Sequence, residues 1–184
     1  MAFSDGETAR VPSTTVGSND GLLLQEFQAR GMQVIGVEPA ENIVQIARER
    51  GVDTIADYFS RGSVDAILAL KGKAAVVTAN NVFAHTGDID GFLDNAKRLL
   101  AEAGVLVIEV QYLLDTLRNL TFDNIYHERR ARGPASRQRA HPGLEFRRRD
   151  PAQPPGASGC RYTLHRAAPG TANRLVTLPA AAGW

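Results

Sequence analysis

Glycines and polar side chains follow short apolar runs at several points in this chain, and the first such group is GSNDG, Gly17–Gly21. Two glycines let a backbone approach a ligand closely, and the first N–H groups of a following helix would be free to bind it. Asp20 adds a carboxylate that can pair with an ammonium group. The spacing differs from the G-x-G-x-x-G of a dinucleotide fingerprint. The segment therefore indicates either a ligand-binding turn or an ordinary tight turn.

Glu38 ends the apolar run VIGVEP, 21 residues after Gly17. An acidic side chain at the tip of a second strand can accept hydrogen bonds from the hydroxyls of a bound ribose. The other interpretation is a solvated carboxylate at a strand end. Together with the glycine turn, Glu38 indicates nucleoside binding. A nicotinamide cofactor stays open, although the turn lacks the third glycine that such a cofactor requires at this spacing.

Two later segments carry groups suited to proton transfer. ANNVFAH, Ala79–His85, places two asparagines near a histidine whose imidazole can act as a general base. FDNIYHE, Phe122–Glu128, brings together a phenol, an imidazole and a carboxylate, which suits catalysis near a carbanion or an enolate. The alternatives are an exposed histidine in the first segment and a polar loop with a partly buried tyrosine in the second.

The hydrophobic pattern predicts the elements that position these groups. Strands are predicted over residues 13–16, 32–39 and 105–110. A short strand with its exit loop is predicted over residues 52–59, and a strand followed by a polar turn over residues 73–83. Helices are predicted over residues 22–30, 40–50, 63–70 and 88–103. Strands that alternate with helices predict an α/β fold, with a mostly parallel sheet and helices on both faces. Ligands of such sheets lie at the carboxyl ends of the strands, which is where the groups described above fall.

Two of these helices carry specific burial predictions. The helix over residues 40–50 has Ile43, Ile46 and Ala47 on one face. The helix over residues 88–103 is predicted to bury Leu99 and Leu100 and to end at Gly104.

Five segments, in this order, resemble the sugar C-methyltransferase family: GSNDG, VIGVEPAENI, NNVFAHTGDIDGFL, GVLVIEVQYLLD and FDNIYHE. Members of that family methylate a carbon of nucleotide-linked keto-deoxysugars in deoxysugar biosynthesis. The resemblance implies a Rossmann-like methyltransferase fold, S-adenosylmethionine as cofactor, methyltransferase activity of class 2.1.1 and a nucleotide-linked sugar as substrate. It covers a cofactor-binding core over residues 13–128, after a polar leader over residues 1–12, and implies no metal in this chain.

The resemblance also implies roles for individual residues. The turn Gly17–Gly21 would lie against the methionine part of the cofactor, and Glu38 and Pro39 would lie at the ribose. Asp57 and Tyr58 would contact adenine, and Asn80, Asn81 and Val82 would border the sulfonium. The residues implied at the substrate are His85, Tyr126 and Glu128. A keto group next to the reacting carbon would allow proton removal, and the resulting enolate would attack the methyl group.

The chain departs from the family pattern at three places. Thr15 stands two positions before the first glycine, where the family has an acidic residue. The family's N-terminal four-cysteine zinc module is not expected here, because the chain has one cysteine. Arg129 stands where the family has the histidine that is its base, and a guanidinium cannot accept a proton at neutral pH. We therefore predict cofactor binding with poor or no sugar methylation, the alternative being a non-catalytic nucleoside-binding remnant.

The resemblance ends at Glu128, and the composition changes there as well. Residues 1–127 have a net charge of −7, whereas residues 128–184 have a net charge of +8, with 11 arginines, no lysine and seven of the nine prolines. Residues 129–184 are therefore predicted to form a basic tail of low order, without the family's C-terminal domain. This tail is either an arm that binds nucleic acid or the product of a frame change in a GC-rich gene.

Composition sets the remaining expectations. The length of 184 residues corresponds to about one domain. No apolar run approaches the roughly 20 residues that cross a membrane, and the leader lacks the apolar stretch of a signal peptide. We therefore expect a cytoplasmic protein.

Overall fold

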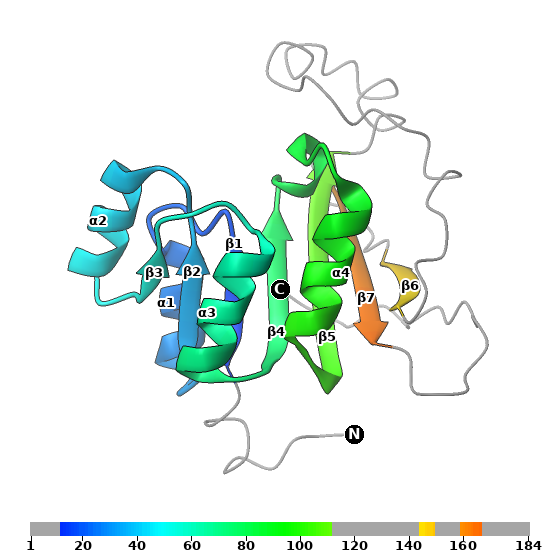
Figure 1. The fold of residues 1–184 in the computed structure, drawn as a ribbon, viewed down its shortest axis with the longest axis horizontal. Helices are drawn as coiled ribbons and strands as arrows, with labels where there is room; N and C mark the ends of the chain where they lie inside the picture. The colour runs from blue at the N-terminus through cyan, green and yellow to red at the C-terminus, as the bar shows by residue number, and fades with distance from the viewer. Residues whose placement is uncertain (1–11, 112–143, 150–158, 167–184) are drawn as a thin grey trace.

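The structure is a computed structural model that describes residues 12–111, 144–149 and 159–166 (Figure 1). These residues form one seven-stranded sheet in the order β3-β2-β1-β4-β5-β7-β6. The strands are β1 (Ser13–Val16), β2 (Val34–Val37), β3 (Thr54–Ile55), β4 (Ala74–Asn80), β5 (Leu100–Gln111), β6 (Leu144–Arg149) and β7 (Gly159–Arg166). The helices are α1 (Leu22–Ala29), α2 (Glu41–Glu49), α3 (Arg61–Lys71) and α4 (Ile89–Leu99), with a short 3-10 helix, η2 (Phe83–His85).

The first five strands are parallel, and β7 runs antiparallel between β5 and β6. The chain builds outward from β1 to β3, then returns to β4 on the other side of β1. This reversal puts the topological switch point between β1 and β4, and ligands of open α/β sheets bind at such a point. The reversed β7 distinguishes this order from the 3-2-1-4-5-6 of dinucleotide-binding sheets. The α/β prediction is confirmed.

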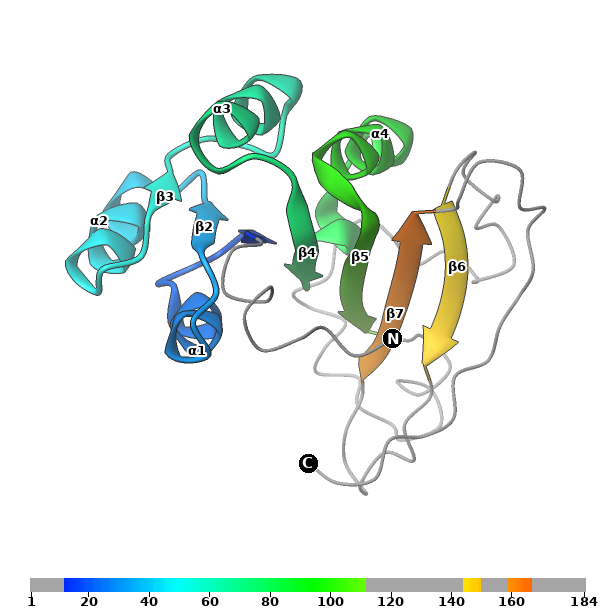
Figure 2. The same cartoon turned by 90° about the horizontal axis from the view of Figure 1, so that it is seen from below.

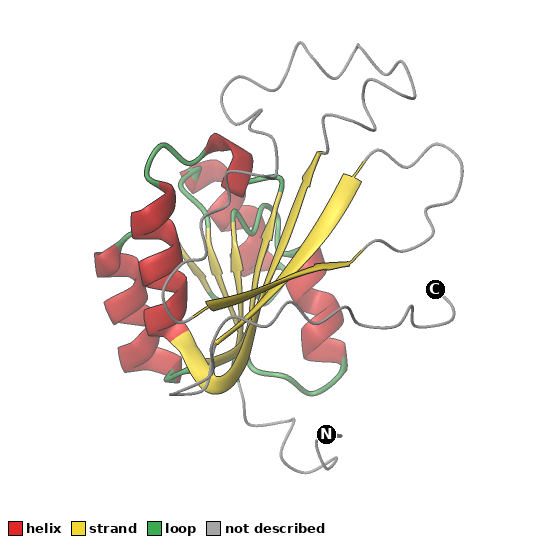
Figure 3. Cartoon of the chain, turned by 90° about the vertical axis from the view of Figure 1, so that its right-hand side faces the viewer, coloured by secondary structure: helices red, strands yellow, loops and turns green. Residues whose placement is uncertain are grey.

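Helices cover both faces of the sheet, with α3 and α4 on one face and α1 on the other (Figures 2 and 3). The larger core lies between the sheet and the α3/α4 pair. Among its fully buried members are Ile35, Ile67, Val77, Leu99, Leu106 and Ile108. A smaller core joins α1 and α2 to the sheet through Leu24, Val34, Ala47 and Val52.

Local capping explains where two of the helices begin. The Ser60 hydroxyl accepts a hydrogen bond from the Ser63 backbone N–H, and the Ser63 hydroxyl accepts one from the Ser60 N–H, so α3 starts with a reciprocal cap. The Asp88 carboxylate accepts a hydrogen bond from the Gly91 N–H at 2.9 Å and caps α4. Both caps fix the point at which a loop at the carboxyl edge of the sheet ends.

The outer strand β3 is short and one of its carbonyls is covered. The carbonyls of Asp53 and Ile55 accept hydrogen bonds from β2 and the residue after it, so the intervening Thr54 carbonyl points toward the open edge of the sheet. The Arg48 guanidinium donates to that Thr54 oxygen through Nε at 3.2 Å and Nη2 at 2.7 Å. The edge carbonyl therefore has a partner from within the chain.

The predicted helix over residues 88–103 is wrong at its C-terminal end. The helix ends at Leu99, and Leu100 has extended dihedral angles, with φ −64° and ψ 139°. Leu100 pairs with Ala74 of β4, and the register shifts before Val76 pairs with Val105. Pairing at the sheet and full burial of Leu100 outweigh the helix propensity of this segment.

The predicted apolar face of α2 is also rotated from the observed one. The helix buries Val44 and Ala47, whereas Ile46 is 39% exposed and Ile43 is half-buried. The helix lies beside the short outer strand, so only a narrow stripe meets the sheet. Hydrophobicity alone did not determine which residues face inward.

The prediction of low order over residues 129–184 is wrong for β6 and β7, which lie within this segment. The sequence pattern of these two segments is that of strands, and a search for the helical period of about 3.6 residues does not detect it. Apolar residues alternate at Leu144 and Phe146, and again at Cys160, Tyr162 and Leu164, which is the period of a strand. Residues 1–11 of the predicted leader lie outside the described residues. Within the described part of the chain, no helix has the length and apolar character needed to cross a membrane.

Candidate functional site

The turn after β1 and the loop after β4 lie against each other. Gly17 has φ +61°, and its N–H donates to the Val37 carbonyl at 2.8 Å. A Cβ atom at Gly17 would lie 2.3 Å from Cγ2 of Val82, so a side chain would collide with the opposite loop. The structure therefore brings together two of the segments that the sequence singled out, and glycine at position 17 permits their close approach.

Glu38 connects the tip of β2 to the same turn. Its Oε2 accepts a hydrogen bond from the Asn19 N–H and its Oε1 accepts one from the Ala40 N–H, both at 3.1 Å. Asn19 has a left-handed backbone, with φ 51°, which presents its N–H to Glu38. Each carboxylate oxygen has a further lone pair. Glu38 can therefore accept hydrogen bonds from a ligand diol while it holds the turn. Pro39 follows it and is exposed.

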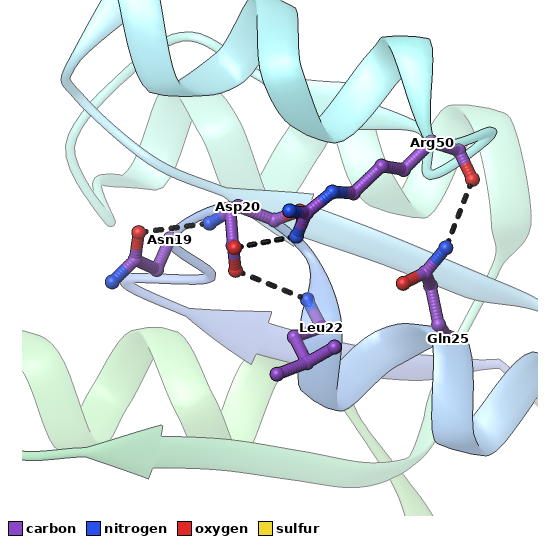
Figure 4. A network of polar contacts seen from close by, with 5 residues as sticks. All are labelled: Asn19, Asp20, Leu22, Gln25 and Arg50. Carbon is purple, nitrogen blue, oxygen red and sulfur yellow. Dashed lines mark hydrogen bonds and ion pairs between the residues drawn. The ribbon is translucent and has the colours of Figure 1, made fainter.

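Asp20 is engaged within the chain (Figure 4). Its carboxylate forms an ion pair with the Arg50 guanidinium and accepts a hydrogen bond from the Leu22 N–H at 3.3 Å. The Arg50 guanidinium, followed by the Leu22 N–H, holds the pKa of Asp20 below its ordinary value of 3.8. The Gln25 side chain donates to the Arg50 carbonyl at 3.2 Å. Asp20 therefore joins α1 to the end of α2, and the carboxylate expected to receive an ammonium group already has a cationic partner.

A buried layer of hydroxyl groups lies in and after β1. The Thr15 and Thr78 hydroxyls share a hydrogen bond of 2.7 Å between β1 and β4. The hydroxyls of Ser13, Thr14 and Ser18 are buried and have no hydrogen-bond partner in the structure. A Cβ atom at Gly36 would lie 2.4 Å from the Ser18 Oγ, so glycine at this position makes room for Ser18. Sequence reasoning missed Gly36 and Thr78, although Gly36 interrupts an otherwise apolar strand.

The loop after β3 carries the two residues expected near adenine. The Asp57 carboxylate accepts hydrogen bonds from the Tyr58 N–H at 2.7 Å and from the Ser60 hydroxyl at 3.4 Å. These bonds order the loop just before α3. Tyr58 is 75% exposed, so its ring is available to a ligand.

The loop after β4 starts from a strained residue. Asn80 pairs with Glu109 of β5, and Asn81 has φ 56° and donates its N–H to the Glu109 carbonyl at 2.8 Å. His85 ends η2, is exposed, and donates its N–H to the Val82 carbonyl at 2.9 Å. The predicted residues Tyr126 and Glu128, and the departure at Arg129, lie outside the described residues.

A cavity of about 500 Å³ lies at the β3 edge of the sheet, and no predicted site residue lines it. Among the residues that the structure describes, no group of three or more histidine, cysteine, aspartate or glutamate side chains is arranged to hold a metal ion.

Comparison with known families finds a match to the model described as "Methyltransferase domain" over residues 16–146. The curated C-methyltransferase NovU of Streptomyces niveus is 40% identical over 112 residues, which are 61% of this chain and 27% of that protein. The chain thus spans about a quarter of the length of this curated relative.

Two solved structures are similar in fold. The plantazolicin methyltransferase BpumL, in complex with a triazolic desmethylPZN analog and SAH, superposes with a TM-score of 0.66 at 12% identity, over 89% of this chain and 77% of that chain. The magnesium protoporphyrin IX methyltransferase ChlM from Synechocystis PCC 6803, with bound SAM, superposes with a TM-score of 0.63 at 14% identity, over 89% of this chain and 73% of that chain.

Proposed function

This chain belongs to the methyltransferase domain family, and from that membership we propose that it binds S-adenosylmethionine at the carboxyl ends of β1 to β4. The bound cofactor would supply an electrophilic methyl group. The observation that carries the proposal is Glu38, whose carboxylate holds the glycine turn through Asn19 and retains acceptor sites for a ribose. The Glu38 carboxylate thereby connects the end of β2 to the turn after β1.

The residues fit the two ends of this cofactor unequally. At the nucleoside end we propose that Glu38 and Pro39 lie at the ribose and that Asp57 and Tyr58 contact adenine. The exposed ring of Tyr58 supports that role. The proposed neighbours of the methyl-bearing sulfur are Asn80, Asn81 and Val82.

At the methionine end, the turn Gly17–Gly21 offers a backbone without a Cβ at its first residue. The Asp20 carboxylate forms an ion pair with Arg50, and the neutral Thr15 hydroxyl forms a hydrogen bond with that of Thr78. We therefore propose that this end contributes less to affinity than the nucleoside end does.

The proposed substrate is a nucleotide-linked keto-deoxysugar that is methylated on carbon. The 40% identity to C-methyltransferase NovU over 112 residues supports methylation on carbon, and the five segments that resemble the sugar C-methyltransferase family support the sugar substrate. We propose that His85, Tyr126 and Glu128 lie at the substrate. Removal of a proton from the carbon beside the keto group, by a base at the substrate, would leave its electron pair in an enolate. The enolate carbon would then form the new bond to the methyl group as the methyl–sulfur bond breaks and S-adenosylhomocysteine leaves. Arg129 cannot accept that proton at neutral pH, so turnover is expected to be slow.

Titration of the full chain with S-adenosylhomocysteine by isothermal calorimetry tests cofactor binding. Glu38→Gln removes the negative charge and weakens acceptance of hydrogen bonds, so we expect affinity to fall about tenfold or more. Glu49→Gln is the matched control, because Glu49 lies at the far end of α2. If the parent and both variants bind with equal affinity, the role of Glu38 is contradicted. If the parent does not bind S-adenosylhomocysteine, the proposed function is contradicted.

Transfer of a labelled methyl group to a nucleotide-linked keto-deoxysugar tests the substrate and the base together. The parent chain should turn over slowly, and Arg129→His should raise the rate about a hundredfold by supplying a group that can accept a proton. Arg130→His is the control for an added histidine. Fast turnover by the parent, or an equal gain in both variants, would contradict the assignment of position 129.

A further inference from the structure

Three aromatic rings meet beside the proposed cofactor site. Phe92, in the second turn of α4, is 4% exposed. Its ring centroid lies 4.9 Å from that of Phe59 and 5.3 Å from that of Phe83. The interplanar angles are 56° and 73°, which are tilted and edge-on arrangements that aromatic pairs favour. Phe92 is the member that contacts both other rings.

The two outer rings belong to different loops at the carboxyl edge of the sheet. Phe59 follows Asp57 and Tyr58 in the loop after β3, and Phe83 follows Val82 in the loop after β4. Val82 in turn lies against Gly17 of the turn after β1. A continuous set of contacts therefore runs from the loop after β3, through Phe92, to the loop after β4 and the glycine turn.

The hydrogen bonds that the structure gives for these loops hold each loop separately. The Asp57 carboxylate accepts hydrogen bonds from Tyr58 of its own loop and from Ser60 at the cap of α3, and the Asn81 N–H donates to Glu109 of β5. The Phe92 ring, by contrast with these hydrogen bonds, contacts a side chain of each loop. Its position on a helix capped by Asp88 gives it a rigid base.

We infer that Phe92 is a positioning residue that sets the separation of the loop after β3 and the loop after β4. This inference rests on the proposed function, because those loops would contact adenine and border the methyl-bearing sulfur. A side chain without a ring at position 92 loses both ring contacts, and we expect the two loops then to move independently. Misplacement of binding groups by about 1 Å is enough to cost a large factor in binding or rate.

Phe92→Leu tests the inference, with Leu93→Val as the matched control. Leu93 is the next residue of α4 and is also buried, at 7% exposed. Each substitution removes a similar apolar volume, and only the first removes a ring. We expect both variants to lose similar stability in urea denaturation. At a temperature where both are folded, Phe92→Leu should bind S-adenosylhomocysteine about tenfold more weakly than the parent, and Leu93→Val should bind within twofold of it.

Amide hydrogen exchange gives a readout that needs no ligand. Phe92→Leu should speed exchange in both residues 56–60 and residues 81–88, whereas Leu93→Val should change neither beyond the shift expected from its stability. Unchanged exchange in either loop overturns the inference, as does an unchanged affinity in Phe92→Leu. Failure of the parent to bind S-adenosylhomocysteine contradicts the proposed function instead, and the exchange data still decide whether Phe92 fixes the loops.

Discussion

Strands β1 and β2 are neighbours of equal length, pair residue for residue, and are buried at every position. Their compositions differ sharply. The inner strand β1 reads STTV, whereas β2 reads VIGV. Three of the four side chains in β1 carry hydroxyls, and one of these, that of Thr15, has a partner in Thr78. Burial of β1 therefore follows from its place between β2 and β4 rather than from its own hydrophobicity.

The difference shows how the sheet divides its tasks. The apolar side chains of β2 contribute to both cores, since Val34 belongs to the smaller and Ile35 and Val37 to the larger. The β1 strand leads into the glycine turn. A hydroxyl that is buried without a hydrogen-bond partner lowers the free energy of unfolding. We therefore expect the side chains of β1 to destabilise the fold and those of β2 to stabilise it. Four measurements test this contrast, from the largest expected effect to the smallest.

Gly36→Ala should have the largest effect. A Cβ atom at position 36 would lie 2.4 Å from the Ser18 Oγ and 2.8 Å from the Ser18 Cβ. Relief of that overlap requires displacement of the turn after β1, and overpacking of this kind costs about 3 kcal/mol. The measurement is urea denaturation of the variant and the parent. Gly62→Ala in α3 is the control, because the nearest atom to its Cβ would be 3.6 Å away, and a gain of about 1 kcal/mol is expected there. Equal effects at the two glycines would contradict the packing argument.

Thr15→Val should lower the free energy of unfolding by about 2 kcal/mol. The change keeps the shape of the side chain and leaves the buried Thr78 hydroxyl without its 2.7 Å partner. The double variant Thr15→Val with Thr78→Val removes both hydroxyls and should recover most of the loss. A double-mutant cycle by chemical denaturation measures the coupling. If the double variant loses the sum of the two single losses, the two hydroxyls do not stabilise each other.

Thr14→Val should act in the opposite direction and raise the free energy of unfolding by about 1 kcal/mol. Thr14 is fully buried, and its hydroxyl has no hydrogen-bond partner in the structure. An isosteric methyl group removes that cost without opening a cavity. Thermal denaturation followed by circular dichroism gives the comparison, with Thr86→Val in the loop after η2 as the control. A loss of stability in Thr14→Val would show that the hydroxyl has a partner.

The pH dependence of stability should show the smallest effect, through Asp20 at the end of the turn after β1. Because Arg50 lowers the pKa of Asp20 in the folded state, ionised Asp20 stabilises the fold above the unfolded value of 3.8. That contribution is lost as the pH falls through the lower folded value. Asp20→Asn should therefore flatten the acid limb of a stability profile recorded between about pH 2 and 6. An unchanged limb would show that the exposed ion pair with Arg50 contributes nothing measurable.

Sequence patterns predicted the elements that carry their own local signals. The β1 strand and the start of α1 were placed to the residue, because glycines and polar residues mark the turn between them. The placement of Glu38 and the glycine turn at the carboxyl ends of their strands followed from the rule that ligands of open α/β sheets bind there, whereas the hydrogen bond between Glu38 and Asn19 was not predicted. The roles of Glu38, the turn, His85, Tyr126 and Glu128 stay predictions.

Features that depend on distant partners could not be predicted in this way. Asp20 and Arg50 are 30 positions apart, and nothing near either residue specifies the ion pair. Leu100 leaves α4 for β5 because Ala74 offers it a strand partner, although its local sequence favours a helix. The contacts of Phe92 with Phe59 and Phe83 likewise depend on how α4 crosses the sheet. In each case local propensity leaves alternative conformations close in energy, and contacts with residues distant in the sequence select one of them.

The covered carbonyl at the β3 edge has a consequence for how copies of this chain meet. An open sheet edge is a template on which another chain can add a strand, and proteins block such edges with short strands and charged side chains. Here β3 has two residues, and the Arg48 guanidinium already donates hydrogen bonds to the Thr54 carbonyl that points to the open edge. A strand of a second molecule would have to displace the charged Arg48 guanidinium to form a hydrogen bond with this carbonyl. We therefore expect Arg48 to disfavour edge-to-edge pairing along this side of the sheet.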